Sequence, residues 1–223
     1  MAALTLHYHP LSSYCHKGLI ALYELNLPFQ RQLHNPGDPA AQSAFLARWP
    51  TGKIPLLVDG ERVVPETSII IEHLDRGRGL MLPQGDEACL TVRLWDRLFD
   101  LYVMTPVQAI VGDRLRAEPE RDPVGVAQAK RTLAMSYDLI ESRMGDGPWA
   151  AGAAFTLADC AAAPSLFYAA TLVPFPATNT KLTAYFERLL QRPSVVRVLE
   201  DAKPFFQFYP YREALPARFL PSP

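Results

Sequence analysis

The spacing of hydrophobic residues changes character part of the way along the chain. Residues 4–8 alternate apolar and polar side chains, which is the period of a strand, and residues 18–25 repeat apolar side chains at helical spacing. Asn26-Leu27-Pro28 ends that helix. A second strand is predicted over residues 29–33 and a short helix over residues 40–48.

A hairpin and another helix follow in the sequence. Asp59-Gly60 lies between the apolar runs 55–58 and 62–64, which is a strong short hairpin signal. Glu66-Thr67-Ser68 precedes a periodic apolar stretch over residues 69–74, so a helix begins there, and all three side chains are able to cap it. This order predicts a βαβ unit followed by ββα, which forms a mixed four-stranded sheet with helices on its faces.

Beyond a linker over residues 80–86 the strand signals stop and only helical periodicities remain. The first of these helices carries two apolar stripes, so we expect it to be central in an all-helical domain. The stripes are Leu90, Leu94, Leu98 and Leu101, and Trp95, Phe99 and Tyr102. Pro106 lies within the continuing pattern and is expected to kink or end the helix. Further helices are predicted over residues 126–144, from Thr156, and over residues 182–190 and 195–202, before an irregular tail that runs to Pro223.

One of these helix starts carries a specific capping signal. Thr156 fits the N-cap position and Asp159 the third helical position, which makes a capping-box variant with Asp in place of Glu. Capping explains Asp159 fully, so we assign it a structural role.

Composition limits the possible functions. The chain has 223 residues, 49% of them hydrophobic and 20% charged, and a net charge of −1, which fits a folded protein and gives no electrostatic case for a nucleic-acid or anionic-membrane partner. No apolar run approaches the ~20 residues of a membrane span, and the N-terminus lacks a signal-peptide pattern. Cys15, Cys89 and Cys160 show no paired metal spacing, so we expect a cytoplasmic protein without a bound metal.

The candidate chemistry lies where the first strand meets the first helix. A helix N-terminus collects unpaired backbone N–H groups and favours an anion. Ser12 and Ser13 stand at this junction, where a hydroxyl can either cap the helix or donate a hydrogen bond to a thiolate. Ser12 also occupies the place of the nucleophilic cysteine in a Cys-x-x-Cys motif, and a serine cannot form a mixed disulfide.

Three motifs together resemble the glutathione transferase family. They are Ser12-Ser13-Tyr14-Cys15, Gly52-Lys53-Ile54-Pro55-Leu56-Leu57 and Glu66-Thr67-Ser68, and the capping box at Thr156 extends the resemblance to nearly the whole chain. The resemblance implies an α/β thioredoxin-like domain over residues 1–82, an all-helical domain over residues 90–223, and glutathione as co-substrate. The serine points to the bacterial serine-type members of the family, in the zeta-like or a related class. Members of the family are usually dimeric, so the resemblance also implies a homodimer.

The resemblance also implies a role for individual residues. Ser12, or Ser13 beside it, would stabilise the glutathione thiolate; lowering a thiol pKa by about two units is worth roughly 2.7 kcal/mol. Cys15 is expected to be a small buried residue; a reactive Cys15 would instead indicate a thiol transferase.

Glutathione itself is expected to lie along the thioredoxin-like domain. By resemblance, a cis Ile54-Pro55 bond turns the Ile54 backbone toward the cysteinyl part of glutathione, and Lys53 sits beside its glycine carboxylate. Glu66 would take the α-ammonium group and Thr67 the α-carboxylate at a helix start.

The electrophile is expected between the two domains, against Phe99, Tyr102, Val103 and Val107 of the long helix. These apolar side chains suggest conjugation of glutathione to an apolar electrophile. Two other hypotheses remain open: a zeta-like glutathione-dependent cis–trans isomerase, and a non-catalytic glutathione-binding or scaffold protein with the same fold.

Overall fold

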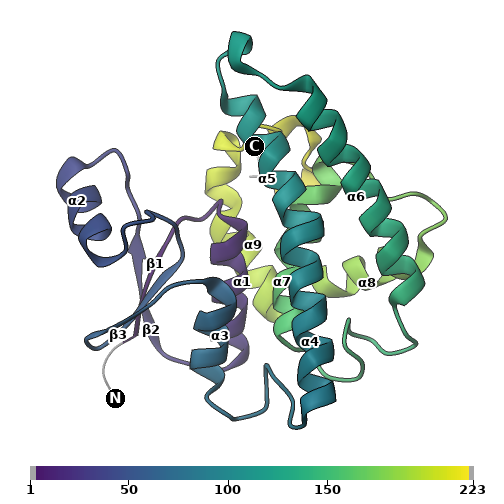
Figure 1. Ribbon diagram of the computed structural model, residues 1–223, viewed down its shortest axis with the longest axis horizontal. Coiled ribbons are helices and arrows are strands. Elements are labelled where there is room, and N and C mark those ends of the chain that lie inside the picture. The colour runs from purple at the N-terminus through teal and green to yellow at the C-terminus, as the bar shows by residue number, and fades with distance from the viewer. Residues whose placement is uncertain (1–3, 221–223) are drawn as a thin grey trace.

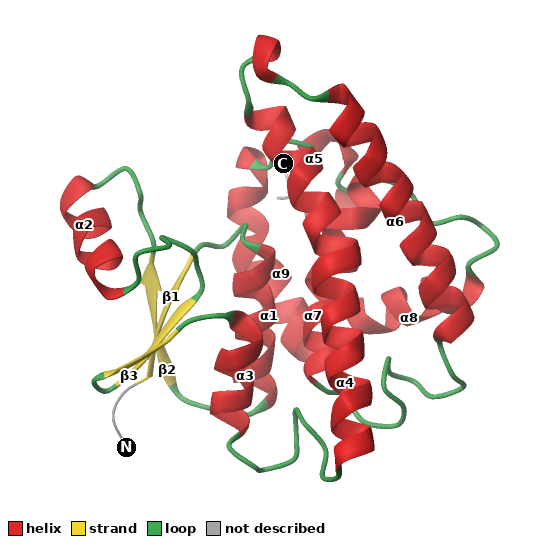
Figure 2. Cartoon of the chain, in the orientation of Figure 1, coloured by secondary structure: helices red, strands yellow, loops and turns green. Residues whose placement is uncertain are grey.

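The computed structural model describes residues 4–220, so the first three residues of the expected N-terminal domain and the last three of the expected tail lie outside it. The N-terminal part contains one mixed four-stranded sheet, as predicted, and its strand order is β2-β1-β3-β4 (Figure 2). Its strands are β1 (Leu4–Tyr8), β2 (Phe29–Leu33), β3 (Leu56–Asp59) and β4 (Arg62–Val64). β2 runs parallel to β1, whereas β3 pairs with β1 and β4 in the antiparallel sense.

Helices cover both faces of this sheet (Figure 1). α1 (Ser13–Glu24) and α3 (Thr67–Asp75) lie on the face that carries the fully buried Leu6 and Leu57. α2 (Pro39–Arg48) lies on the other face and is anchored by Phe45, whose ring is 5.5 Å from the ring of His7 in β1. α1 and α3 therefore occupy the layer between the sheet and the helical domain.

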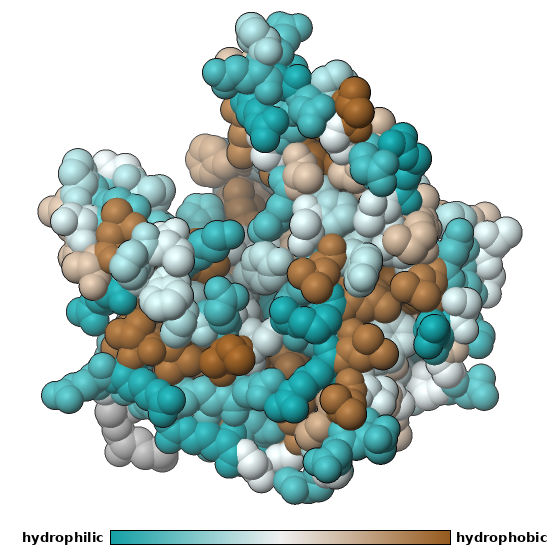
Figure 3. Space-filling view, in the orientation of Figure 1, coloured by the Kyte–Doolittle hydropathy of each residue, from teal (hydrophilic) through white to brown (hydrophobic). Residues whose placement is uncertain are grey.

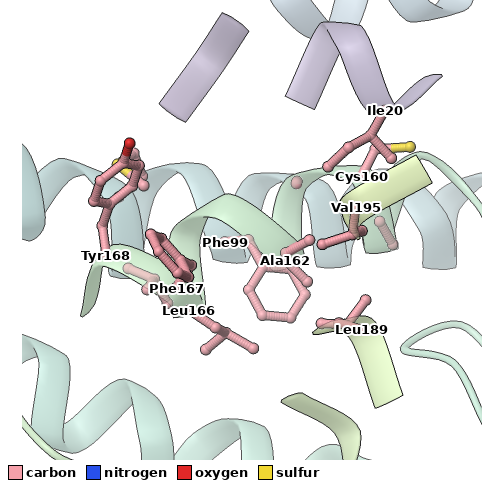
Figure 4. Packing of buried hydrophobic residues seen from close by; sticks show 14 of the residues in the cluster. Ile20, Phe99, Cys160, Ala162, Leu166, Phe167, Tyr168, Leu189 and Val195 are labelled. Atoms are coloured by element: carbon pink, nitrogen blue, oxygen red, sulfur yellow. The ribbon is translucent and has the colours of Figure 1, made fainter. Parts of the chain in front are cut away.

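The helical domain is built around α7 (Leu157–Leu172), because residues 157–169 are buried on every side of that helix. Figure 4 shows Ala162, Leu166 and Phe167 of α7 packed among side chains from several other elements. The surrounding helices are α4 (Asp86–Leu98), α5 (Thr105–Leu115), α6 (Pro123–Arg143), α8 (Thr180–Leu190) and α9 (Pro193–Ala202). Short 3-10 turns follow α9 through the described part of the tail. Among the helices of residues 4–220, none is long and apolar enough to cross a membrane.

α4 is not the central helix that its two stripes suggested. Trp95, Phe99 and Leu98 are buried, but Tyr102 is 48% exposed, and Leu90, Leu94 and Leu101 are 58%, 62% and 52% exposed. A second apolar stripe is therefore no proof of burial, since it can also form an exposed face. α4 also begins at Asp86, within the segment expected to be a linker.

The expected disturbance at Pro106 takes the form of a π-helical turn, η1 (Phe99–Met104), which joins α4 to α5 in one continuous rod (Figure 1). Pro106 has no N–H group to donate to the carbonyl of Tyr102, four residues earlier. Ser136 of α6 places its Oγ 2.9 Å from the Tyr102 carbonyl oxygen and 2.7 Å from the Thr132 carbonyl oxygen, so the two acceptors share its one proton. The Tyr102 carbonyl thus has a partner on another helix at the position where the proline supplies none.

The predicted capping box at the start of α7 is confirmed. The Thr156 N–H group donates to Asp159 Oδ2 at 2.8 Å, and the Ala150 N–H group donates to Asp159 Oδ1 at 2.9 Å. The Tyr185 hydroxyl adds a third bond to Oδ1 at 2.6 Å. Although burial raises the pKa of Asp159, these donors satisfy its carboxyl group in the core.

Candidate functional site

A cleft of about 680 Å³ lies between the thioredoxin-like domain and the α4–α5 rod. The thioredoxin-like domain contributes Tyr14, Trp49, Lys53, Ile54, Pro55, Glu66, Thr67, Ser68, Ile69 and Glu72. The rod contributes Arg93, Asp96, Arg97, Asp100, Leu101, Thr105 and Gln108. All five residues predicted to bind glutathione therefore line one cleft, although they come from separate parts of the chain.

Lys53, Ile54 and Pro55 form one edge of the cleft, immediately before β3. The Ile54-Pro55 peptide bond is cis, as expected. Pro55 is buried, while Ile54 is partly exposed and Lys53 is exposed. This edge therefore presents the Ile54 backbone and the Lys53 ammonium group to the cleft.

Glu66 and Thr67 form the second predicted part of the site, at the start of α3. Glu66 has a φ angle of +63°, which is uncommon for a residue other than glycine and is often found at functional sites. The expectation that side chains cap this helix is wrong for its N-cap residue, because Glu66 makes no capping hydrogen bond. The uncapped helix start can therefore accept an anion, and the Glu66 carboxylate is not engaged in capping.

Ser12 is the N-cap residue of α1, and its Oγ accepts a hydrogen bond from the Cys15 N–H group at 3.3 Å. Ser13 begins the helix and is buried. Neither serine is among the residues that line the cleft, whereas Tyr14 is. A hydroxyl that accepts a hydrogen bond keeps its own proton to donate. The capping role of Ser12 is thus compatible with a donor role toward a ligand.

Two buried side chains hold the loop that leads into Ser12. His16 donates from Nε2 to the carbonyl oxygen of Pro10, and the Tyr168 hydroxyl of α7 donates to the carbonyl oxygen of Leu11 at 3.0 Å. Burial lowers the pKa of His16 to about 4, so its ring is neutral at physiological pH. The helical domain therefore fixes the backbone immediately before Ser12.

Cys15 has the structural role expected of it. Its side chain is fully buried, and burial raises the pKa of the thiol to about 12. The thiol is consequently protonated at physiological pH and has no access to a disulfide partner.

Tyr14 is a cleft residue that was not predicted as part of the site. Burial, together with the nearby Asp100 carboxylate, raises the pKa of its hydroxyl to about 12. The hydroxyl therefore remains a hydrogen-bond donor at neutral pH. Its position two residues after Ser12, in the same turn, was the available signal.

A buried ion cluster beneath the cleft was also not predicted. Lys17 of α1 is 1% exposed, and its Nζ lies 2.5 Å from Asp96 Oδ1 and 2.8 Å from Asp100 Oδ2 on the rod. Ser68 of α3 accepts a hydrogen bond from the same Nζ at 2.9 Å and donates to Asp96 Oδ2 at 2.8 Å. The cluster joins the two domains at the bottom of the cleft, which its Ser68, Asp96 and Asp100 also line.

The sequence did contain a signal for this cluster. Lys17 stands in the buried part of α1, while Asp96 and Asp100 are four residues apart on a mostly apolar segment. Charges at such positions rarely go unpaired in a core. The sequence offered no reason to pair Lys17 with Asp100, because the two residues are 83 positions apart.

The four residues predicted to bind the electrophile do not line this cleft. Phe99 and Val103 are fully buried, and Val107 is 3% exposed. Figure 4 shows the Phe99 ring in the core beside Ala162 and Leu189. Tyr102 is 48% exposed but lies outside the cleft lining.

Comparison with known proteins agrees with this arrangement. The family model of the glutathione S-transferase N-terminal domain matches residues 6–80, and that of the C-terminal domain matches residues 123–188. The chain is 26% identical to glutathione S-transferase F6 of Arabidopsis thaliana, over 89% of this chain and 100% of the relative. It is 28% identical to FtsZ-localized protein A of Caulobacter vibrioides, over 90% of this chain and 92% of the relative.

Solved structures show the same fold. A glutathione S-transferase of Methylobacterium radiotolerans, in complex with glutathione sulfonate, is 27% identical with a TM-score of 0.77, covering 88% of this chain and 94% of that one. A glutathione S-transferase of Methylobacillus flagellatus with bound glutathione has a TM-score of 0.80 at 22% identity, covering 88% of this chain and 98% of that one. With a thioredoxin-like domain, a helical domain and both family models matched in order, this chain belongs to the glutathione transferase family.

Proposed function

We propose that this protein binds glutathione in the cleft and conjugates the glutathione thiolate to an electrophile. The observation that carries the proposal is that Lys53, Ile54, Pro55, Glu66 and Thr67 line one cleft beside the start of α1. Two solved relatives hold glutathione or glutathione sulfonate, which supports the same ligand here.

The charges of the cleft suit the two ends of the tripeptide. The Lys53 ammonium group is available to the glycine carboxylate, and the Glu66 carboxylate to the α-ammonium group of the γ-glutamyl residue. The uncapped start of α3 at Thr67 offers backbone N–H groups to the α-carboxylate. The cysteinyl sulfur would then point toward the N-terminus of α1.

Ser12 is proposed to stabilise the thiolate by donating its hydroxyl hydrogen to the sulfur. A hydrogen bond to a charged group contributes about 1.5–3 kcal/mol, and a helix N-terminus adds about 0.3–1 kcal/mol. Together they account for a thiol pKa about two units below its free value. The thiolate then forms a bond to the electrophilic carbon, and the leaving group departs with the bonding pair.

Replacement of Ser12 tests this mechanism. Ser12→Ala should raise the pKa of bound glutathione, measured by thiolate absorbance, and should lower kcat/KM for a small aryl halide about 10²-fold, the magnitude typical for a lost charge-stabilising donor. Ser12→Thr keeps both the cap and the donor and should retain activity. Ser13→Ala serves as the neighbouring control. Unchanged activity in Ser12→Ala would exclude Ser12 from thiol activation.

One relative is named for localisation to FtsZ and not for transfer, which keeps the non-catalytic hypothesis open. That hypothesis predicts glutathione uptake in calorimetry without a thiolate absorbance at neutral pH. The isomerase hypothesis predicts turnover of a conjugated cis double bond without consumption of glutathione. The thiol-transferase hypothesis requires an exposed thiolate, and the burial of Cys15 argues against it.

A homodimer is proposed on the exposed apolar stripe of α4, formed by Leu90 and Leu94, which lie outside the cleft lining. Figure 3 shows hydrophobic side chains gathered along α4 on this face of the molecule. Leu94→Glu should give a monomer by light scattering, because burying an unpaired carboxylate opposes association. Leu115→Glu, at a position that is 71% exposed at the end of α5, is the matched control. A dimer that persists in Leu94→Glu would contradict the use of this stripe.

A further inference from the structure

The wall that the helical domain presents to the cleft is polar. Its side chains come from one line along the rod: Arg93, Asp96, Arg97, Asp100, Leu101, Thr105 and Gln108. Leu101 is the apolar member of that line. A second substrate lying between the start of α1 and the rod therefore contacts mostly hydroxyl, amide and charged groups.

The π-helical turn η1 decides which residue of the next turn joins this wall. In a regular α-helix, Met104, seven residues after Arg97, would lie on the same face as Arg93 and Arg97. A π turn takes up about one extra residue, which displaces every later position by about 100° around the axis. Met104 and Val107 consequently face the core, at 1% and 3% exposure, and the exposed Thr105 lies in the cleft wall, with Gln108 further along it.

The charged groups of the wall already have partners of opposite charge. Arg93 lies 2.8 Å from Glu72 of α3, and Arg97 lies 2.7 Å from both Asp96 and Asp100. A charged substrate would have to compete with these ion pairs. The uncharged groups that remain are the Gln108 amide and the oxygen of Thr105, which still accepts a hydrogen bond although its proton is donated to the Asp100 carbonyl at 3.0 Å.

We propose that the second substrate is an uncharged polar electrophile, whose hydroxyl or amide N–H group donates to the Thr105 oxygen and whose polar groups also hydrogen-bond to the Gln108 amide. This inference rests on the proposed function, since it concerns the partner of glutathione in the same cleft. An α,β-unsaturated amide is a member of this class. Its β-carbon forms a bond to the sulfur, its π pair moves to the α-carbon, and the proton of the thiol ends there, so no further reactant is needed.

Three stable glutathione adducts test this specificity without requiring turnover. They are the S-conjugates of N-(2-hydroxyethyl)acrylamide, N-propylacrylamide and N-acryloylglycine, which share one linkage and end in a hydroxyl, a methyl or a carboxylate group. Calorimetry should give a Kd for the hydroxyl conjugate about fivefold below those of the other two, the size of one or two hydrogen bonds. In the double variant Thr105→Val/Gln108→Leu, the hydroxyl and methyl conjugates should have about equal Kd values, or the methyl conjugate should bind more tightly.

A matched pair on another helix provides the control. Thr132 and Gln128 lie four residues apart on α6, and the Thr132 hydroxyl donates to a helix carbonyl at 3.2 Å, as the Thr105 hydroxyl does at 3.0 Å. Thr132→Val/Gln128→Leu should leave all three Kd values unchanged.

The outcomes separate the two proposals. Failure of free glutathione to bind would overturn the proposed function, and this inference with it. Binding of free glutathione together with tighter binding of the methyl or carboxylate conjugate would overturn only the polar substrate class. A hydroxyl preference that survives in Thr105→Val/Gln108→Leu would also overturn it, because the wall residues would not be its source.

Discussion

Replacement of Lys17 by methionine probes the cluster that joins the two domains. Methionine keeps the length and apolar character of the side chain but removes the ammonium group. Asp96 and Asp100, whose side chains are 2% and 8% exposed, then lose the partner within 2.8 Å that balances their charge. Breaking one side of a buried ion pair costs about 3–5 kcal/mol.

Arg97 remains beside both carboxylates at 2.7 Å, so the lower end of that range applies. A loss of about 3 kcal/mol in the free energy of unfolding corresponds to a decrease in Tm of about 10 °C for a chain of this size. Urea unfolding and calorimetry of Lys17→Met measure both quantities. Lys130→Met on the exposed side of α6 is the control and should change stability by less than about 0.5 kcal/mol.

The pH dependence of this loss gives a second readout. Burial raises the pKa of Asp100, and Lys17 lowers it, so removal of Lys17 raises it further. An acid whose pKa is higher in the folded state than in the unfolded state binds more protons when folded. Stability therefore falls as pH rises from the unfolded pKa, about 3.9, through the higher folded pKa.

The penalty of Lys17→Met should accordingly be smallest near pH 4 and increase toward neutral pH. Lys17→Met/Asp100→Asn should recover part of the loss, because one of the two carboxylates is then neutral at every pH. A Lys17→Met variant as stable as the wild type at pH 7, or a penalty independent of pH, would refute this account of the cluster.

Three further predictions concern other parts of the fold. Ser136→Ala should lower the free energy of unfolding by about 1–3 kcal/mol, because the Tyr102 carbonyl loses the hydroxyl that it shares with the Thr132 carbonyl; urea unfolding measures this, and no loss would contradict the role of that hydroxyl. Asp159→Ala should cost at least about 3 kcal/mol by the same assay, since it removes the acceptor of four buried hydrogen bonds, whereas a cost below 1 kcal/mol would contradict its structural role. In the folded protein a disulfide reagent should modify the partly exposed Cys89 but not the buried Cys15, and rapid modification of Cys15 would show that its thiol is accessible.

Local signals in the sequence were sufficient for much of the fold. The alternation over residues 4–8 and the Asp59-Gly60 turn predicted strands that the structure contains, because such patterns report which face of a segment is buried. Thr156 and Asp159 predicted the capping box, since both partners lie within one turn. The motifs around Ile54 and Glu66 likewise identified residues that share the cleft.

The tertiary structure decided what depends on contacts between distant segments. Helical periodicity assumes 3.6 residues per turn, so it could not anticipate that a π turn before Pro106 would direct Val107 to the core and Thr105 to the cleft. Periodicity also could not pair Lys17 with Asp96, because nothing local joins helices so far apart in the chain. Patterns determine which side chains can be buried, but packing between helices determines which of them meet.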